Sequence, residues 1–189
     1  MTRIIGGTWG GRRITVPPQG TRPTTDRVRE AMFSSVTSIL AREGKTWGEC
    51  TVVDMYAGSG ALGLEAASRG ARDVVLVESA RAAALVARAN IDALGSSGVQ
   101  VSSMDVNEWV RTWRGASRDV IFADPPYSVE DADLIGLWQA MERHGLTSHD
   151  ALVIVERPTS SANPLGVEWT VTDQRRYGDT VVWYGRRTK

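Results

Sequence analysis

From residue 51 onward, short apolar runs alternate regularly with segments whose apolar residues recur every three or four positions. The runs have the length of buried strands, and the segments between them have the periodicity of amphipathic helices. Such alternation is typical of a doubly wound α/β fold, in which right-handed crossovers join parallel strands. The pattern predicts strands over residues 51–56, 73–78, 99–104, 119–123 and 151–156, and helices over 61–69, 80–94, 107–113 and 130–143.

The first part of the chain departs from this alternation. Strand-like runs over 3–9 and 12–16 flank Gly10-Gly11, and paired glycines suit a tight hairpin turn. A helix is expected next, with Thr24 or Thr25 as its N-cap. We therefore expect residues 1–20 to form a small N-terminal β-hairpin.

The last part of the chain returns to strands alone. Runs near 168–172 and 180–185 predict a terminal antiparallel pair, which brings the expected strands of the main sheet to seven. We therefore expect residues 21–189 to form one α/β domain with a doubly wound, seven-stranded, Rossmann-like sheet.

The composition fits a globular protein with one core. Of 189 residues, 42% are hydrophobic and 23% are charged, and no apolar run is long enough to span a membrane. The single cysteine, Cys50, excludes an intrachain disulfide. The two histidines have no cysteines nearby, so we expect no metal site. No secretory signal is visible, and we expect a cytoplasmic protein.

A formal net charge of zero conceals an uneven distribution of charge. Residues 1–30 hold six arginines against two acidic residues, and residues 171–189 hold five basic residues against two acidic ones. The middle of the chain is correspondingly acidic. Two basic ends indicate either a phosphate-facing surface built from both termini or two solvated basic segments.

A glycine-rich stretch from Asp54 to Gly63 follows the first strand of the alternation and opens a helix. Its glycines permit a tight turn and let a ligand approach the backbone closely. The spacing from Gly58 to Gly63 also matches the dinucleotide fingerprint, so this stretch alone leaves a nicotinamide cofactor open. We expect Ala57, Gly58 and Gly60 to line a site for a nucleoside cofactor.

Four carboxylates fall at the ends of successive expected strands. Asp54 precedes the glycines, where an acid suits a cofactor bearing an ammonium group, as S-adenosylmethionine does, and would repel a pyrophosphate. Glu78 suits ribose hydroxyls, Asp105 suits an adenine amine, and Asp124 is the fourth. Ligands bind at the carboxyl ends of parallel strands, so the acids predict one site. Its expected cofactor-binding residues are Asp54, Ala57, Gly58, Gly60, Glu78, Ser79, Asp105 and Val106.

The fourth acid begins the stretch Asp124-Pro125-Pro126-Tyr127, which follows a buried apolar run. Consecutive prolines lack N–H groups and fix φ, so the chain leaves the sheet here in an extended form. The Asp124 carboxylate and the Pro125 carbonyl would then converge as acceptors for a planar exocyclic amine. Tyr127 would stack on the base or amide that carries the amine. The structural alternative is a strand terminator with a packed tyrosine.

Together these residues resemble the class I S-adenosylmethionine-dependent methyltransferases, and more narrowly the RsmD family of 16S ribosomal RNA guanine-N2 methyltransferases. The resemblance implies S-adenosylmethionine as cofactor and catalytic roles for Asp124, Pro125, Pro126 and Tyr127. The Asp-Pro-Pro-Tyr motif is shared by enzymes acting on adenine N6, guanine N2 and glutamine amides, so it specifies an amino acceptor and not one substrate. The matching segments are Arg3 to Gly7, Arg22 to Thr24, Arg27 to Phe33, Asp54 to Gly63 and Asp124 to Tyr127.

The resemblance also implies a partner. It implies methylation of a specific guanine in 16S rRNA, on the assembled 30S subunit, by a monomer without a metal. RNA is expected to contact Arg3, Arg12 and Arg13 of the N-terminal hairpin and Arg22 after it, while Tyr127 holds the base. Three other functions remain compatible with the residues: adenine N6 methylation of DNA or RNA, nicotinamide-dependent oxidoreduction, and non-catalytic RNA binding.

Overall fold

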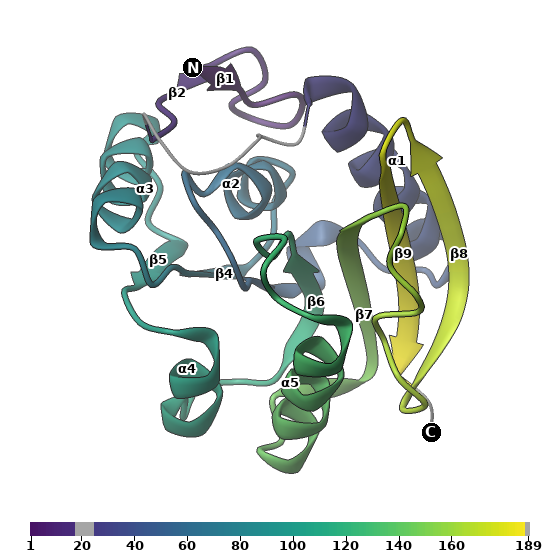
Figure 1. Cartoon of the computed structure of the whole chain (residues 1–189). Coiled ribbons are helices and arrows are strands. Elements are labelled where there is room, and N and C mark those ends of the chain that lie inside the picture. Colours follow the sequence, from purple (N-terminus) through teal and green to yellow (C-terminus); the bar gives the residue numbers. More distant parts are fainter. Residues whose placement is uncertain (18–24, 188–189) are drawn as a thin grey trace.

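The computed structural model describes residues 1–17 and 25–187, and a seven-stranded mixed sheet forms its centre (Figure 1). The strands lie in the order β5-β4-β3-β6-β7-β9-β8, with β9 antiparallel to both of its neighbours and all other pairs parallel. The expected α/β class and the terminal antiparallel pair are therefore confirmed. The strands are β3 (Thr51–Asp54), β4 (Asp73–Val77), β5 (Val99–Ser102), β6 (Arg118–Ala123), β7 (Thr147–Pro158), β8 (Trp169–Tyr177) and β9 (Thr180–Arg187).

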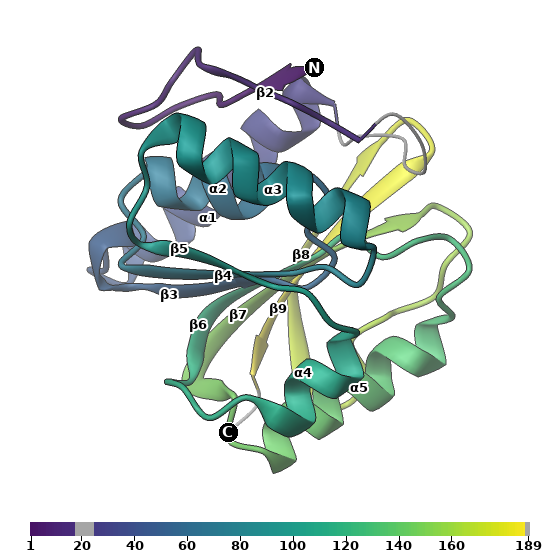
Figure 2. The same ribbon diagram turned by 90° about the vertical axis from the view of Figure 1, so that its left-hand side faces the viewer.

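Helices cover both faces of the sheet: α1, α2 and α3 lie on one side and α4 and α5 on the other (Figure 2). The two faces follow from the alternation of strand side chains. Val52 and Phe122 belong to the core cluster under α1 to α3, whereas Val53 and Ile121 belong to the cluster under α4 and α5. The helices are α1 (Asp26–Arg42), α2 (Ala61–Ser68), α3 (Arg81–Leu94), α4 (Val106–Thr112) and α5 (Asp131–Arg143), with a short 3-10 helix, η1 (Trp47–Glu49).

Two strands are longer than the apolar pattern predicts. β7 and β8 span twelve and nine residues, where the pattern predicts residues 151–156 and 168–172. Most of β8 is exposed, and its sequence is largely polar, so apolar periodicity cannot find its full length. Thr180 of β9 pairs with both Pro158 and Tyr177. The β8–β9 turn therefore lies at the edge of the sheet where the parallel strands end.

The predicted N-terminal antiparallel pair is confirmed, but its strands are much shorter than the predicted ranges 3–9 and 12–16. β1 (Thr2–Arg3) and β2 (Arg13–Ile14) make only two residue pairs. The intervening amides bond to α2 instead: those of Ile5 and Gly6 donate to the Glu65 carboxylate at 2.6 and 2.9 Å. A buried carboxylate competes here with strand pairing, and the chain wraps around the end of α2.

The turn predicted at Gly10-Gly11 is confirmed, because the Arg12 amide donates to the Trp9 carbonyl at 3.0 Å across these two glycines. Gly11 has φ +83°, but the sharper requirement for glycine falls at Gly7, which has φ +75°. A Cβ on Gly7 would lie 1.9 Å from the carbonyl oxygen of Ser68, so only glycine lets the chain approach α2 this closely.

Residues 2–16, called here the N-terminal arm, pack onto the α/β domain. Ile4 and Ile14 are 0% and 2% exposed and belong to the same core cluster as α1, α2 and α3. The arm is therefore part of one hydrophobic core, while the boundary predicted at residue 20 lies outside the described residues. Within the described residues, no helix is both long and apolar enough to cross a membrane.

Candidate active site

A cleft of about 320 Å³ opens at the carboxyl ends of the parallel strands. Its position follows from the sheet topology, because β3, β4 and β6 are neighbours and end at the same edge. Of the predicted cofactor and catalytic residues, the cleft is lined by Asp54, Ala57, Gly58, Glu78, Ser79, Asp105, Val106, Asp124 and Pro126. Four carboxylates predicted from separate strand ends thus share one cavity.

The glycines of the loop before α2 have different tasks. Gly58 has φ +54°, and a Cβ placed on it would meet open space, so its backbone is accessible to a ligand. A Cβ on Gly60 or Gly63 would instead lie 2.8 or 2.2 Å from the side chain of Leu76 in β4. Gly60, predicted to bind cofactor, does not line the cleft; it allows α2 to pack closely on the sheet.

Asp54 is buried at the end of β3, with 1% of its surface exposed. Its Oδ2 accepts the Gly63 amide at 3.0 Å, whereas its Oδ1 has no hydrogen-bond partner among the described residues. Burial, with a smaller contribution from the charge of Glu78, raises the pKa of Asp54 to about 7. A cationic group bound in the cleft would stabilise the carboxylate form.

Glu78 and Asp105 already hold backbone groups at the rim of the cleft. The Glu78 carboxylate accepts the amides of Gly58 and Ala80 at 2.8 and 2.7 Å. Asp105 is exposed and caps α4 by accepting the Asn107 amide at 2.8 Å. Each carboxylate therefore fixes the shape of a loop and still presents acceptor capacity to the cleft.

The Asp-Pro-Pro-Tyr stretch leaves β6 as predicted. Asp124 is half-buried, Pro125 is buried, and the Val129 amide closes a turn onto the Pro126 carbonyl at 2.9 Å. Tyr127 stands on this turn with 71% of its surface exposed, so it is not the packed strand terminator of the structural alternative. Its ring is available to a flat partner from outside.

Arg157 forms hydrogen bonds that hold the same turn. This residue was not predicted from the sequence. Only 5% exposed, it donates from Nη2 to the Val129 carbonyl at 2.8 Å and from Nε to Asp131 at 2.9 Å. Asp131 in turn accepts the Ala162 amide at 3.1 Å. Arg157 ties the end of β7 to the turn that carries Tyr127.

The comparisons with known proteins agree with this geometry. The family model described as "Conserved hypothetical protein 95" matches residues 2–186. The Escherichia coli K12 protein named "Ribosomal RNA small subunit methyltransferase D" is 32% identical over 178 residues, which cover 93% of this chain and 85% of that protein. The chain belongs to the RsmD family.

Solved structures extend this assignment to the fold. One from Escherichia coli, named for the methyltransferase yhhF, is 31% identical with a TM-score of 0.82 and covers 98% of this chain and 97% of its own. A more distant structure, complexed with SAH, is 17% identical with a TM-score of 0.62 and covers 72% of this chain and 45% of its own. The distant structure shares the methyltransferase fold alone.

The arginines predicted to contact RNA differ in what they already bind. Arg12 donates to the carbonyls of Ala93 and Leu94 at the end of α3, and Arg3 pairs with Asp26 at 3.3 Å while 63% of its side chain stays exposed. Arg13 is exposed and forms no ion pair or hydrogen bond through its side chain with the described residues. Arg22 lies outside the described residues.

The basic C-terminal segment is largely neutralised by ion pairs. Arg186 pairs with Glu43, Arg187 with Glu142, and Arg175 with Asp173 at 2.8 Å. This segment therefore contributes less free positive charge to a phosphate-facing surface than its composition indicates.

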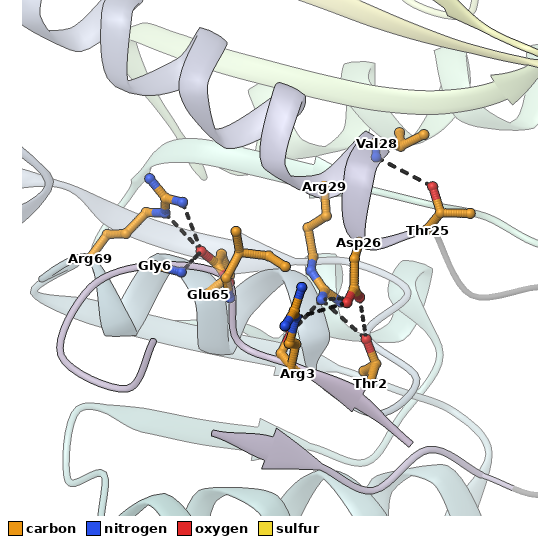
Figure 3. A network of polar contacts seen from close by, with 10 residues as sticks. Thr2, Arg3, Gly6, Thr25, Asp26, Val28, Arg29, Glu65 and Arg69 are labelled. Carbon is orange, nitrogen blue, oxygen red and sulfur yellow. Dashed lines mark hydrogen bonds and ion pairs between the residues drawn. The ribbon is translucent and has the colours of Figure 1, made fainter. Parts of the chain in front are cut away.

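The cleft also has a wall that sequence reasoning missed. Thr2, Val16, Pro17 and Arg29 line it from the N-terminal arm, the residue after the arm and α1. Arg29 is 1% exposed and donates to Thr2 Oγ1, to the Arg3 carbonyl and to Asp26 (Figure 3), and burial lowers its pKa. In the sequence, Arg29 lies at helical spacing from the apolar residues of α1, and this spacing was the signal that could have predicted its burial.

Proposed function

We propose that this protein transfers a methyl group from S-adenosylmethionine to the exocyclic N2 amine of a specific guanine in 16S rRNA. The observation that carries the proposal is the shared cleft, in which Asp124 lies with Asp54, Glu78 and Asp105. Residues 124–129 are called the acceptor turn below, because they would hold the amine that accepts the methyl group. The name of the Escherichia coli relative supports an rRNA substrate, and the fold neighbour that holds SAH supports the cofactor.

The residues of the cleft fit this cofactor. Asp54 has a buried oxygen without a hydrogen-bond partner among the described residues, and a cofactor ammonium would satisfy it. Glu78 would accept ribose hydroxyls, and Asp105 would accept the adenine amine beside the buried Val106. Gly58 and Ser79 lie at the cleft surface, where the cofactor can approach the backbone. When bound, the cofactor supplies an electrophilic methyl group on a sulfonium.

The acceptor turn would activate and orient the amine. Guanine N2 is a poor nucleophile because its lone pair is delocalised into the ring. Hydrogen bonds to the Asp124 carboxylate and the Pro125 carbonyl would favour a pyramidal nitrogen with its lone pair directed at the methyl group. Asp124 and Pro125 would hold the amine for attack on the methyl group that the cofactor supplies, and the methylated nitrogen would then lose its proton to solvent.

The target guanine would be turned out of its stack to enter the cleft. Tyr127, exposed on the turn, would hold the extruded base by stacking, and Pro126 lies beside it at the cleft wall. Arg3 and Arg13 on the arm would contact phosphates near the same opening. An enzyme this small has little surface to recognise a whole RNA fold, so we propose the assembled 30S subunit as the substrate and a monomer in the cytoplasm as the active form.

The test is methyl transfer from labelled S-adenosylmethionine to 30S subunits that lack the modification, followed by nucleoside analysis. Labelled N2-methylguanosine at one site is expected, and the Asp124→Asn variant serves as the inactive control. Label in N6-methyladenosine would keep the chemistry and change the acceptor. Absence of label, with SAH bound in a calorimeter, would refute the rRNA substrate.

A further inference from the structure

Buried polar side chains hold the N-terminal arm on α2 and α3. Glu65, 0% exposed, accepts the amides of Ile5 and Gly6 and also pairs with Arg69 (Figure 3). Ser68, 2% exposed, accepts the Trp9 amide at 2.9 Å and donates to the Gly6 carbonyl at 2.6 Å. Both residues touch the arm without making a hydrogen bond to the glycine loop.

Asn90 of α3 differs because it bonds to the arm and to the glycine loop together. It is 4% exposed; its Oδ1 accepts the Thr15 amide, and its Nδ2 donates to the Thr15 carbonyl, each at 2.9 Å. The same Nδ2 donates to the carbonyl of Ser59 at 2.9 Å. Ser59 lies between Gly58 and Gly60, in the loop that opens α2.

One partner of Asn90 lines the cleft, and the other directly precedes residues that line it. Ser59 lines it directly, and Val16 and Pro17, which follow Thr15, line it from the opposite segment. A ligand in the cleft therefore contacts two segments, and the side-chain amide of Asn90 forms hydrogen bonds to the backbones of both. If the loop shifts, the amide must turn or lose a hydrogen bond, and the two bonds to Thr15 change with it.

We propose that Asn90 is a positioning residue that couples cofactor binding at the glycine loop to the ordering of the N-terminal arm. Because coupling is reciprocal, an arm ordered by RNA strengthens cofactor binding by the same factor. The inference rests on the proposed function for both its cofactor and its RNA. Its protein part, the ordering of the arm by the cofactor, requires no RNA.

Hydrogen exchange of the full chain with and without SAH tests the protein part. Saturating SAH is expected to slow exchange of the Thr15 amide about three- to ten-fold in the wild type, the range that one net buried hydrogen bond supplies. Asn90→Ala, and the isosteric Asn90→Asp if the first variant does not fold, should remove this protection. Ser68→Ala is the matched control and should keep it. SAH that binds without slowing exchange at Thr15 would overturn the inference, whereas failure of SAH to bind would refute the proposed cofactor instead.

RNA affinity measured with and without SAH tests the coupling itself. We expect SAH to tighten binding of the wild type to the 30S subunit several-fold, and this ratio should fall to about one in the Asn90 variants. Ser68→Ala should weaken RNA binding while leaving the ratio unchanged. An equal loss of the ratio in both variants would show that Asn90 acts only by stabilising the arm and would overturn the proposal.

Discussion

The two halves of the cleft are built in different ways. On the cofactor side, protein carboxylates hold the loops: Glu78 accepts the Gly58 amide, and Asp54 accepts the Gly63 amide. On the acceptor side, the turn carries Tyr127, which is 71% exposed, and Arg157 donates a hydrogen bond to the Val129 carbonyl of this turn. In the proposed function, the chain itself therefore preorganises the cofactor half, whereas the substrate would complete the acceptor half.

The largest effect is expected at Asp124, where the two halves meet. Asp124→Ala should lower the methyl-transfer rate by at least about a hundred-fold, since it removes an acceptor that orients the amine, and should weaken SAH binding only modestly. Single-turnover label transfer and calorimetry measure the two quantities. A near-normal rate would remove Asp124 from the mechanism.

Arg157 tests whether the acceptor turn depends on its support. Arg157→Met should lower the rate about ten- to a hundred-fold through misplacement of the turn, with SAH affinity unchanged. Arg157→Lys, which keeps the charge but not the two directed bonds, should recover only part of the rate. If the methionine variant loses stability and keeps its rate per folded molecule, Arg157 is structural only.

Substitution of Tyr127 tests whether the exposed part of the acceptor half binds the target base. Tyr127→Ala should raise KM for the RNA about ten-fold, because base stacking on an aromatic ring contributes about 1–3 kcal/mol. Tyr127→Phe keeps the stacking face and should behave like the wild type. The melting temperature should not change in either variant, given the exposure of the ring. An unchanged KM in the alanine variant would refute stacking.

The pH dependence of SAH affinity tests the role of Asp54 in the cofactor half. Its pKa of about 7 means that the ligand-free carboxyl is largely protonated at pH 6, so SAH affinity should fall up to about ten-fold for each pH unit below 7. Asp54→Asn should flatten this dependence. Since the folded pKa lies above the ordinary value of 3.8, the wild type should also lose stability as pH rises from about 4 to about 7, and the asparagine variant should not.

The smallest effects are expected on the arm, and they separate two neighbouring arginines. Arg13→Gln should weaken RNA binding a few-fold and reduce the slope of log affinity against log salt by about one, the value for one phosphate contact. Arg12→Gln should mainly lower the melting temperature, because Arg12 bonds to the end of α3. Equal salt slopes for the Arg13 variant and the wild type would exclude Arg13 from the RNA surface.

Most of the residues predicted for the site line one cleft, because the sequence signals that mark them are local. Asp54 and Asp124 each end an apolar run, and parallel strands must bring such ends to one edge. Asn90 and Arg157 could not be found in this way, because their partners lie 75 and 28 residues away and neither belongs to a motif. The arm strands were overpredicted for a related reason: Glu65, about 60 residues later, takes the amides that would pair.

The docking of the arm also bears on how the chain is made. The arm is synthesised before the elements that hold it, since Glu65 and Asn90 follow their partners Ile5 and Thr15 by 60 and 75 residues. While the nascent chain lengthens, the arm has no surface to bind until α2 and α3 have emerged and packed on the sheet. Closing loops of this length costs conformational entropy, and only contacts with the finished sheet and its helices offset this cost. The arm, which is synthesised before α2 and α3, is thus among the last segments to take its final shape.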